Sequence, residues 1–135
     1  MKIICISGGF DPVHIGHINL IKEAAKYGEV IVILNSDAWL ERKKLYAVMP
    51  WQERAEILAW MRSVKAVAAV DDSDGTVCEA LRRIKPDYFA NGGDRTVENT
   101  PELDLCRELG IKLLFNIGGD KVASSSEIIA RATNG

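Results

Sequence analysis

Short apolar runs alternate along the chain with segments in which apolar residues return every three or four positions. The apolar runs cover residues 3–6, 29–34, 66–70, 87–90 and 111–115. Short apolar runs bounded by turn residues predict buried strands, and the periodic segments between them predict helices. Strands that alternate with helices are typical of a parallel sheet with helices on both faces. We therefore expect one α/β domain over residues 1–135, built on a five-stranded parallel sheet.

Proline, glycine and small polar residues mark where the expected helices begin and end. Helical patterns are expected over 18–27, from Pro50 onward, from Thr76 to before Pro86, over 100–109 and from Ser124 to about Ala132. Proline suits the first turn of a helix because its missing N–H would have no partner there. Residues 38–49 show no clear apolar period, so we expect a loop there that could close over a site.

Length, charge and cysteine content narrow the class of protein. The 135 residues carry a net charge of −2, which gives no general attraction to nucleic acid or to an anionic membrane. The sequence has no apolar run long enough to span a bilayer and no signal-peptide pattern. Cys5, Cys78 and Cys106 form no CxxC pair, which favours reduced packing thiols in a cytoplasmic protein.

The most informative segment runs from Gly8 to His17 and has the sequence Gly-Gly-Phe-Asp-Pro-Val-His-Ile-Gly-His. It lies between the first predicted strand and the first predicted helix, where free N–H groups and the helix dipole favour an anion. Gly8 and Gly9 allow a tight turn and a close approach of the backbone to a ligand. His14 and His17 are the only histidines, and their spacing places them on one helix face. This combination predicts a phosphate site.

Two other interpretations of the histidine pair are open. The pair could lie on the surface beside an ordinary glycine turn, but strand, turn, histidines and helix occur in the order that a phosphate site requires. The pair could also bind a metal ion with Asp11 as a third ligand. We rank the metal site lower, because HxxH spacing without a glutamate or a third histidine is a weak metal pattern.

The segment from Gly8 to His17 resembles the GxFDxxHxGH signature of the cytidylyltransferase-like nucleotidyltransferases. The resemblance implies a single Rossmann-like domain that joins a nucleoside triphosphate to a phosphorylated small molecule. It implies that His14 and His17 are catalytic. It also implies nucleotide and phosphate binding by Gly8, Gly9, Phe10, Asp11 and Gly16.

Later segments extend the resemblance almost to the C-terminus. Members of the family use a lysine after the second strand to neutralise the triphosphate, which points to Lys43 or Lys44 without deciding between them. Arg54, four residues after Pro50, resembles a family arginine that could contact the acceptor's phosphate. Further residues expected to bind the nucleotide or its phosphates are Gly92, Gly93, Asp94, Arg95, Ser124, Ser125 and Ser126.

Two departures from the family pattern bear on the branch. The glycerol-phosphate branch has an arginine before the serine segment, where this chain has only Lys121 nearby. Gly9 stands where relatives often carry a hydroxyl or thiol side chain. With the Asn-Ser-Asp-Ala run at 35–38, the chain most resembles the heptose 1-phosphate adenylyltransferase branch. The resemblance therefore favours ATP and a sugar phosphate such as D-glycero-D-manno-heptose 1-phosphate. CTP, with glycerol-3-phosphate or ethanolamine-phosphate as acceptor, is the alternative.

The expected reaction needs no general base, because a phosphate is already a nucleophile. Its oxygen would attack the α-phosphorus of the triphosphate in line and release pyrophosphate, while His14, His17 and a lysine stabilise the growing charge. Mg²⁺ would accompany the triphosphate and keep mostly water and phosphate oxygens as ligands. A non-catalytic nucleotide-binding domain of the same fold is the rival from another class. The expected partners are the NTP and the phosphorylated acceptor, and a homodimer is left open.

Overall fold

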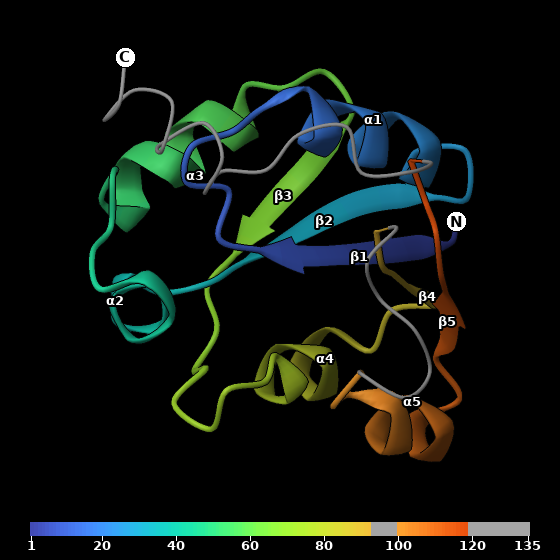
Figure 1. Ribbon diagram of the computed structural model, residues 1–135. Helices are drawn as coiled ribbons and strands as arrows, with labels where there is room; N and C mark the ends of the chain where they lie inside the picture. Colours follow the sequence, from blue (N-terminus) through green and yellow to red (C-terminus); the bar gives the residue numbers. More distant parts are fainter. Residues whose placement is uncertain (93–99, 119–135) are drawn as a thin grey trace.

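Residues 1–92 and 100–118 are described by a computed structural model of the protein, in which strands and helices alternate (Figure 1). The elements are β1 (Ile3–Gly8), α1 (Ile15–Ala24), β2 (Glu29–Leu34), α2 (Asp37–Lys44), α3 (Trp51–Ala59), β3 (Val64–Ala68), α4 (Cys78–Ile84), β4 (Tyr88–Ala90), α5 (Leu103–Leu109) and β5 (Lys112–Leu114). Every predicted strand agrees with an observed strand to within two residues at each end. The helix predicted from Ser124 lies outside the described residues. Within the described ranges, no helix is both long and apolar enough to cross a membrane.

The five strands form one parallel sheet in the order β3-β2-β1-β4-β5, which confirms the predicted fold class. β1 is central, because Cys5 is in register with Ile31 of β2 on one side and with Phe89 of β4 on the other. The chain runs outward from β1 through β2 to β3 and then returns to add β4 beside β1. Strand order therefore reverses between β1 and β4. Open α/β sheets bind ligands at such a reversal, at the carboxyl ends of the strands.

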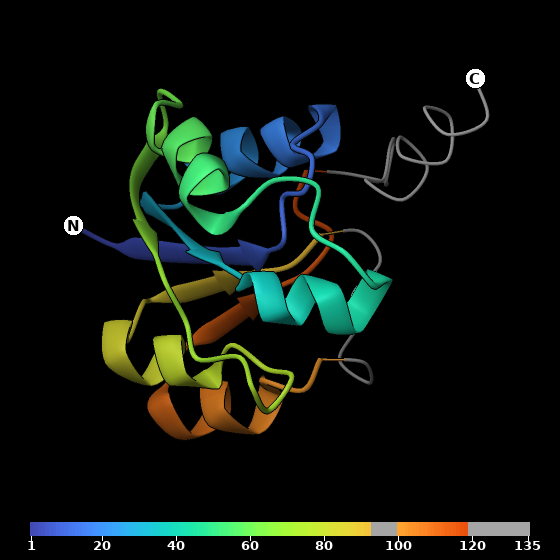
Figure 2. The ribbon, with the colours of Figure 1, turned by 90° about the vertical axis from the view of Figure 1, so that its left-hand side faces the viewer.

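Helices cover both faces of the sheet, with α1 and α3 on one face and α4 and α5 on the other (Figure 2). Successive residues of a strand point to opposite faces, so β1 contributes to two separate cores. Ile4 and Ile6 belong to the core that contains Leu58 of α3. Cys5 belongs to the second core, with Leu81 of α4. α2 belongs to neither layer and lies across the carboxyl ends of the strands (Figure 2).

The loop predicted over residues 38–49 is wrong for most of its length, because Asp37–Lys44 form the helix α2. The helix begins with a capping hydrogen bond, in which the Trp39 N–H donates to Ser36 Oγ over 3.0 Å. Only Leu40 is fully buried in this helix. A helix with a single buried position has no apolar period, so the pattern could not reveal it. The irregular segment is thus limited to residues 45–49.

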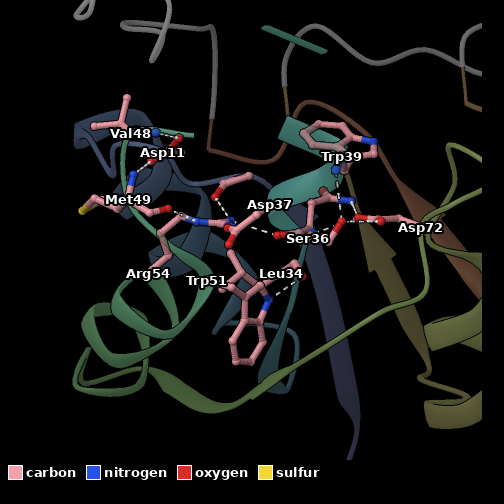
Figure 3. A network of polar contacts seen from close by, with 12 residues as sticks. Asp11, Leu34, Ser36, Asp37, Trp39, Val48, Met49, Trp51, Arg54 and Asp72 are labelled. Carbon is pink, nitrogen blue, oxygen red and sulfur yellow. Dashed lines mark hydrogen bonds and ion pairs between the residues drawn. The ribbon is translucent and has the colours of Figure 1, made fainter. Parts of the chain in front are cut away.

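Arg54 is fully buried and joins four segments that surround the carboxyl ends of β1 and β2 (Figure 3). Its Nη1 donates to the carbonyl oxygens of Gly9 (2.8 Å) and Asn35 (2.9 Å). Its Nε donates to the Met49 carbonyl oxygen (2.9 Å), and its Nη2 lies 2.5 Å from Asp37 Oδ1. The guanidinium therefore holds the glycine turn, the end of β2, the start of α2 and the segment after α2 in one arrangement.

The three cysteines are buried and unpaired, as expected for packing thiols. Burial raises the pKa of the Cys5 thiol to about 12, with a smaller contribution from Cys106. Burial also raises the pKa of Cys106 to about 11, followed by the effects of Glu102 and Cys78. Both thiols therefore stay protonated near neutral pH, and a protonated buried thiol is a poor nucleophile.

We expect Cys5 and Cys106 in the folded protein to resist labelling by a thiol reagent at pH 8. Burial raises both pKa values above the ordinary value of 9.0, so ionising either thiol disfavours the folded state. The free energy of unfolding is therefore unaffected by these thiols below pH 9 and falls as the pH rises towards 11–12. Mass spectrometry of labelled peptides, with and without denaturant, measures the reaction at each site. Rapid labelling of either thiol without denaturant would contradict this prediction.

Replacing Arg54 with methionine should lower the free energy of unfolding by about 3–5 kcal/mol, because a carboxylate and three carbonyl oxygens lose their donor. Arg54→Lys should also destabilise, since one ammonium cannot reproduce the planar spread of guanidinium donors. Arg107→Met on the exposed face of α5 is the matched control and should change stability by less than about 0.5 kcal/mol. Urea unfolding of the three variants measures the change in the free energy of unfolding. Equal midpoints for Arg54→Met and the control would disprove the role of the buried guanidinium.

Candidate active site

The glycine turn after β1 is packed closely against the first turn of α2. A Cβ atom added to Gly9 would lie 2.6 Å from Leu40 Cδ2 and 3.5 Å from Trp39 Cζ3. The next residue, Phe10, is buried and has a φ of +50°, a left-handed conformation that non-glycine residues seldom adopt. Position 9 therefore has no room for a side chain unless Leu40 moves, and α2 forms one wall of the turn.

His14 and His17 lie together at the start of α1, as the sequence predicts. His14 is the N-cap residue, and its Nδ1 accepts a hydrogen bond from the Gly16 N–H over 3.1 Å. Nδ1 of His17 accepts from the His14 N–H, also over 3.1 Å, and the two rings stack with centroids 3.8 Å apart. Since both Nδ1 atoms are acceptors, each neutral ring carries its proton on Nε2. The pair therefore caps the helix and supplies two Nε2–H donors beside the helix N-terminus.

Asp11 holds the segment after α2, which differs from the metal ligation considered for it above (Figure 3). Its buried carboxylate accepts hydrogen bonds from the backbone N–H groups of Val48 (2.6 Å) and Met49 (2.8 Å). Lys44 Nζ lies 3.1 Å from the same carboxylate and donates to the Asp11 carbonyl oxygen over 2.6 Å. The carboxylate oxygens are thus occupied. In the described part of the chain, no three histidine, cysteine or acidic side chains are placed to hold a metal ion.

The two candidate lysines differ in their surroundings. Lys44 is mostly buried and lies against the signature turn through Asp11. Lys43 is exposed, and its ammonium lies 4.7 Å from the centre of the Trp39 ring. Lys44 thus lies beside the signature turn, and Lys43 lies beside the Trp39 ring.

Asp72 shapes the site although nothing in the sequence singled it out. Its buried carboxylate accepts from Asn35 Nδ2 (2.9 Å), the Ser36 N–H (2.8 Å) and Ser36 Oγ (2.6 Å), as Figure 3 shows in part. These bonds fix the start of α2 next to the end of β2. The Ser36-Asp37 pair was a local signal for a helix start, but no local pattern points to a partner 36 residues away.

The remaining predicted residues are only partly accounted for. Gly92 follows β4 at the same edge of the sheet as the glycine turn. Arg54 was expected to contact an acceptor's phosphate, but its buried guanidinium is committed to the contacts described above, so this geometry does not support that role. Further predicted residues, which lie outside the described part of the chain, are Gly93, Asp94, Arg95, Lys121, Ser124, Ser125 and Ser126.

Known proteins are similar in sequence to this chain over most of its length. The model of the Cytidylyltransferase-like family matches residues 5–131. The bifunctional protein HldE of Gluconobacter oxydans is 33% identical over 117 residues, which is 84% of this chain and 24% of that protein. HldE of Streptomyces coelicolor is also 33% identical, over 98% of this chain and 29% of that protein. The chain thus spans about a quarter of the length of these relatives.

A third relative has nearly the same length as this chain. FAD synthase of Pyrococcus abyssi is 27% identical over 136 aligned positions, which cover 96% of this chain and 91% of that protein. The same unit thus occurs both within longer proteins and as nearly the whole of a short one.

Solved structures share the fold. The lipopolysaccharide core biosynthesis protein of Thermoplasma volcanium superposes with a TM-score of 0.73 at 21% identity, covering 85% of this chain and 95% of that one. A protein of unknown function from Archaeoglobus fulgidus gives a TM-score of 0.66 at 22% identity, covering 85% and 88%. The family match extends over the signature turn and the strand-order reversal beside it, and the chain therefore belongs to the cytidylyltransferase-like family of nucleotidyltransferases.

Proposed function

We propose that the protein transfers an adenylyl group from ATP to the phosphate of a sugar phosphate and releases pyrophosphate. D-glycero-D-manno-heptose 1-phosphate is the favoured acceptor. The observation that carries the proposal is the stacked pair of His14 and His17 at the start of α1, directly after the glycine turn. The alignment with HldE proteins over 84% and 98% of the chain supports the choice of ATP and a heptose phosphate.

The chemistry rests on positioning and on charge stabilisation. An oxygen of the acceptor's phosphate forms the new bond to the α-phosphorus, and the bond from that phosphorus to the bridging oxygen breaks, with its electron pair leaving on pyrophosphate. The Nε2–H groups of His14 and His17 donate to phosphate oxygens as negative charge builds there. The free N–H groups at the start of α1 favour the same charge.

Lys44 is the better placed of the two lysines to serve the triphosphate. Its ammonium lies 2.6 Å from the main-chain oxygen of Asp11, within the signature turn, whereas Lys43 lies over the Trp39 ring. In this position the ammonium offsets the negative charge of the Asp11 carboxylate, which would otherwise repel the phosphates expected at the turn.

Mg²⁺ would accompany the nucleotide at this site. In residues 1–92 and 100–118, the Asp11 carboxylate is already occupied by two backbone N–H groups and by Lys44, so phosphate oxygens and water are the ligands that we expect for the ion. When bound, Mg²⁺ would neutralise part of the charge on the triphosphate.

A second candidate acceptor is flavin mononucleotide. The FAD synthase of Pyrococcus abyssi matches this chain over nearly the full length of both proteins. FAD is flavin mononucleotide joined to an AMP unit, so its synthesis is also an adenylyl transfer to a phosphate. The two candidates share the nucleotide and the bond that forms, and differ in the group that the acceptor's phosphate carries.

A pyrophosphate-release screen tests the proposed function. Purified protein with Mg²⁺ and ATP should release pyrophosphate when heptose 1-phosphate is added and should release little without an acceptor. Flavin mononucleotide, glycerol 3-phosphate and ethanolamine phosphate form the comparison panel, each with ATP and with CTP. Tight nucleotide binding with no turnover on any acceptor would favour a non-catalytic nucleotide-binding domain instead.

Replacing His14 or His17 with alanine should lower kcat about 10²-fold or more, with little change in the Kd for ATP, if the donors act on the transition state. Single-turnover kinetics measures the loss. Each alanine also removes a cap from α1, at a cost of about 1 kcal/mol, so thermal unfolding is measured in parallel.

His14→Asn separates the two roles. Asparagine is a good N-cap residue and its side-chain oxygen can accept the capping bond, so α1 should stay capped. Its side-chain NH₂ supplies one donor, so the variant should retain only part of the activity of the imidazole. A slow but normally stable His14→Asn protein supports catalysis by the ring. Near-normal turnover in both His14→Ala and His17→Ala would rule out the proposed role of the pair.

A further inference from the structure

Trp39 lies beside the glycine turn, on the first turn of α2. The edge of its indole ring is 3.5 Å from the position that a Cβ atom on Gly9 would occupy. The ring is only partly buried, so one part of it packs on the turn while another part stays accessible. A large aromatic surface therefore borders the segment that we assign to the phosphates.

Hydrogen bonds from Asp72 through Ser36 fix the backbone of Trp39 (Figure 3). The buried Asp72 carboxylate accepts from both the N–H and the hydroxyl of Ser36, and Ser36 Oγ in turn accepts from the Trp39 N–H. Leu40, the next residue, packs on Gly9 and is almost fully buried. The backbone that carries the indole is thus held in place before any ligand binds, which reduces the entropy that binding would cost.

Lys43 stands one helical turn after Trp39, with its ammonium 4.7 Å from the centre of the ring. The pair combines a flat apolar face with a positive charge on the same side of one helix. A flat flavin ring, or the C–H face of a sugar ring, packs well on an indole, and a phosphate pairs well with an ammonium. A molecule that carries both a ring and a phosphate matches both features at once.

We propose that Trp39 and Lys43 form the acceptor subsite, in which the indole packs against the ring of the acceptor and Lys43 pairs with its phosphate. The inference rests on the proposed function and specifies its substrate class: a phosphorylated ring compound rather than a phosphorylated open chain. α2 follows β2, on the side of β1 opposite to β4, so this subsite and the Gly92 edge flank the turn from two sides. A nucleotide at the Gly92 edge leaves the α2 side for the acceptor.

Steady-state kinetics on three tryptophan variants tests the subsite. Trp39→Leu should raise the KM for heptose 1-phosphate about tenfold, while kcat and the KM for ATP stay within about twofold. Trp39→Phe, which keeps an aromatic face, should recover a good part of the loss. Trp60→Leu is the matched control, because Trp60 is 82% exposed on the surface after α3 and should leave all constants unchanged. Lys43→Met should also raise the acceptor KM, and this effect should shrink at high salt.

A comparison of acceptors shows which ring compound binds at Trp39. Heptose 1-phosphate and flavin mononucleotide each carry a ring, and whichever is the acceptor should respond to Trp39→Leu. Glycerol 3-phosphate has a phosphate but no ring, so any binding of it should be insensitive to Trp39 and sensitive to Lys43. An unchanged acceptor KM in Trp39→Leu, or a rise in the KM for ATP instead, would overturn the proposal.

Equilibrium binding separates failure of the subsite from failure of the function. Isothermal titration with heptose 1-phosphate, flavin mononucleotide and ATP needs no turnover. If the wild-type protein releases no pyrophosphate but binds a ring phosphate through Trp39, the function fails and the subsite stands. If the wild-type protein turns over and Trp39→Leu and Trp39→Phe bind the acceptor as well as it does, the subsite fails and the function stands.

Discussion

The buried guanidinium of Arg54 is the interaction on which the geometry of the candidate site depends. A buried charge is strongly unfavourable unless it is paired and hydrogen-bonded, and Arg54 meets both conditions through Asp37 and three carbonyl oxygens. Its partners come from positions 9, 35, 37 and 49, so one side chain joins the glycine turn, the junction between β2 and α2, and the segment after α2. Moving any one of these segments would leave a buried polar group without a partner. The glycine turn therefore keeps its shape because its own carbonyl oxygen is one of those partners.

Two buried carboxylates extend this constraint to α2 and the segment after it. Asp72 holds the first turn of α2 through Ser36, and Asp11 holds the backbone at Val48 and Met49. The helix is therefore anchored at its start and just beyond its end, and it forms a fixed wall beside the glycine turn. Only the few residues between Lys44 and Val48 lack such anchors among the contacts described. A rigid wall suits a reaction that depends on positioning a phosphate and stabilising its charge.

The sequence predicts what is encoded locally and misses what is encoded across the chain. The strands and the glycine turn with its two histidines follow from runs, spacing and order in short segments, and they were predicted correctly. Arg54 was assigned to a phosphate because its partners are mostly backbone carbonyl oxygens, which no side-chain pattern identifies. α2 was missed because one buried residue, Leu40, gives no period, although Ser36 offered a cap signal. The Arg54 miss concerns contacts with backbone atoms elsewhere in the chain, whereas the α2 miss concerns a helix with one buried position and a local cap signal that the apolar pattern does not include.

Gly9 is the point at which the signature turn packs against the neighbouring helix α2. Position 9 carries only a hydrogen atom, and the space that a Cβ would need is filled by Leu40 and bordered by Trp39. The turn is therefore bordered by an apolar and aromatic surface of α2, close to the histidines that cap α1. In the proposed subsite, an acceptor would meet this surface beside the phosphates. The proposed choice of acceptor therefore depends on α2 as well as on the signature turn.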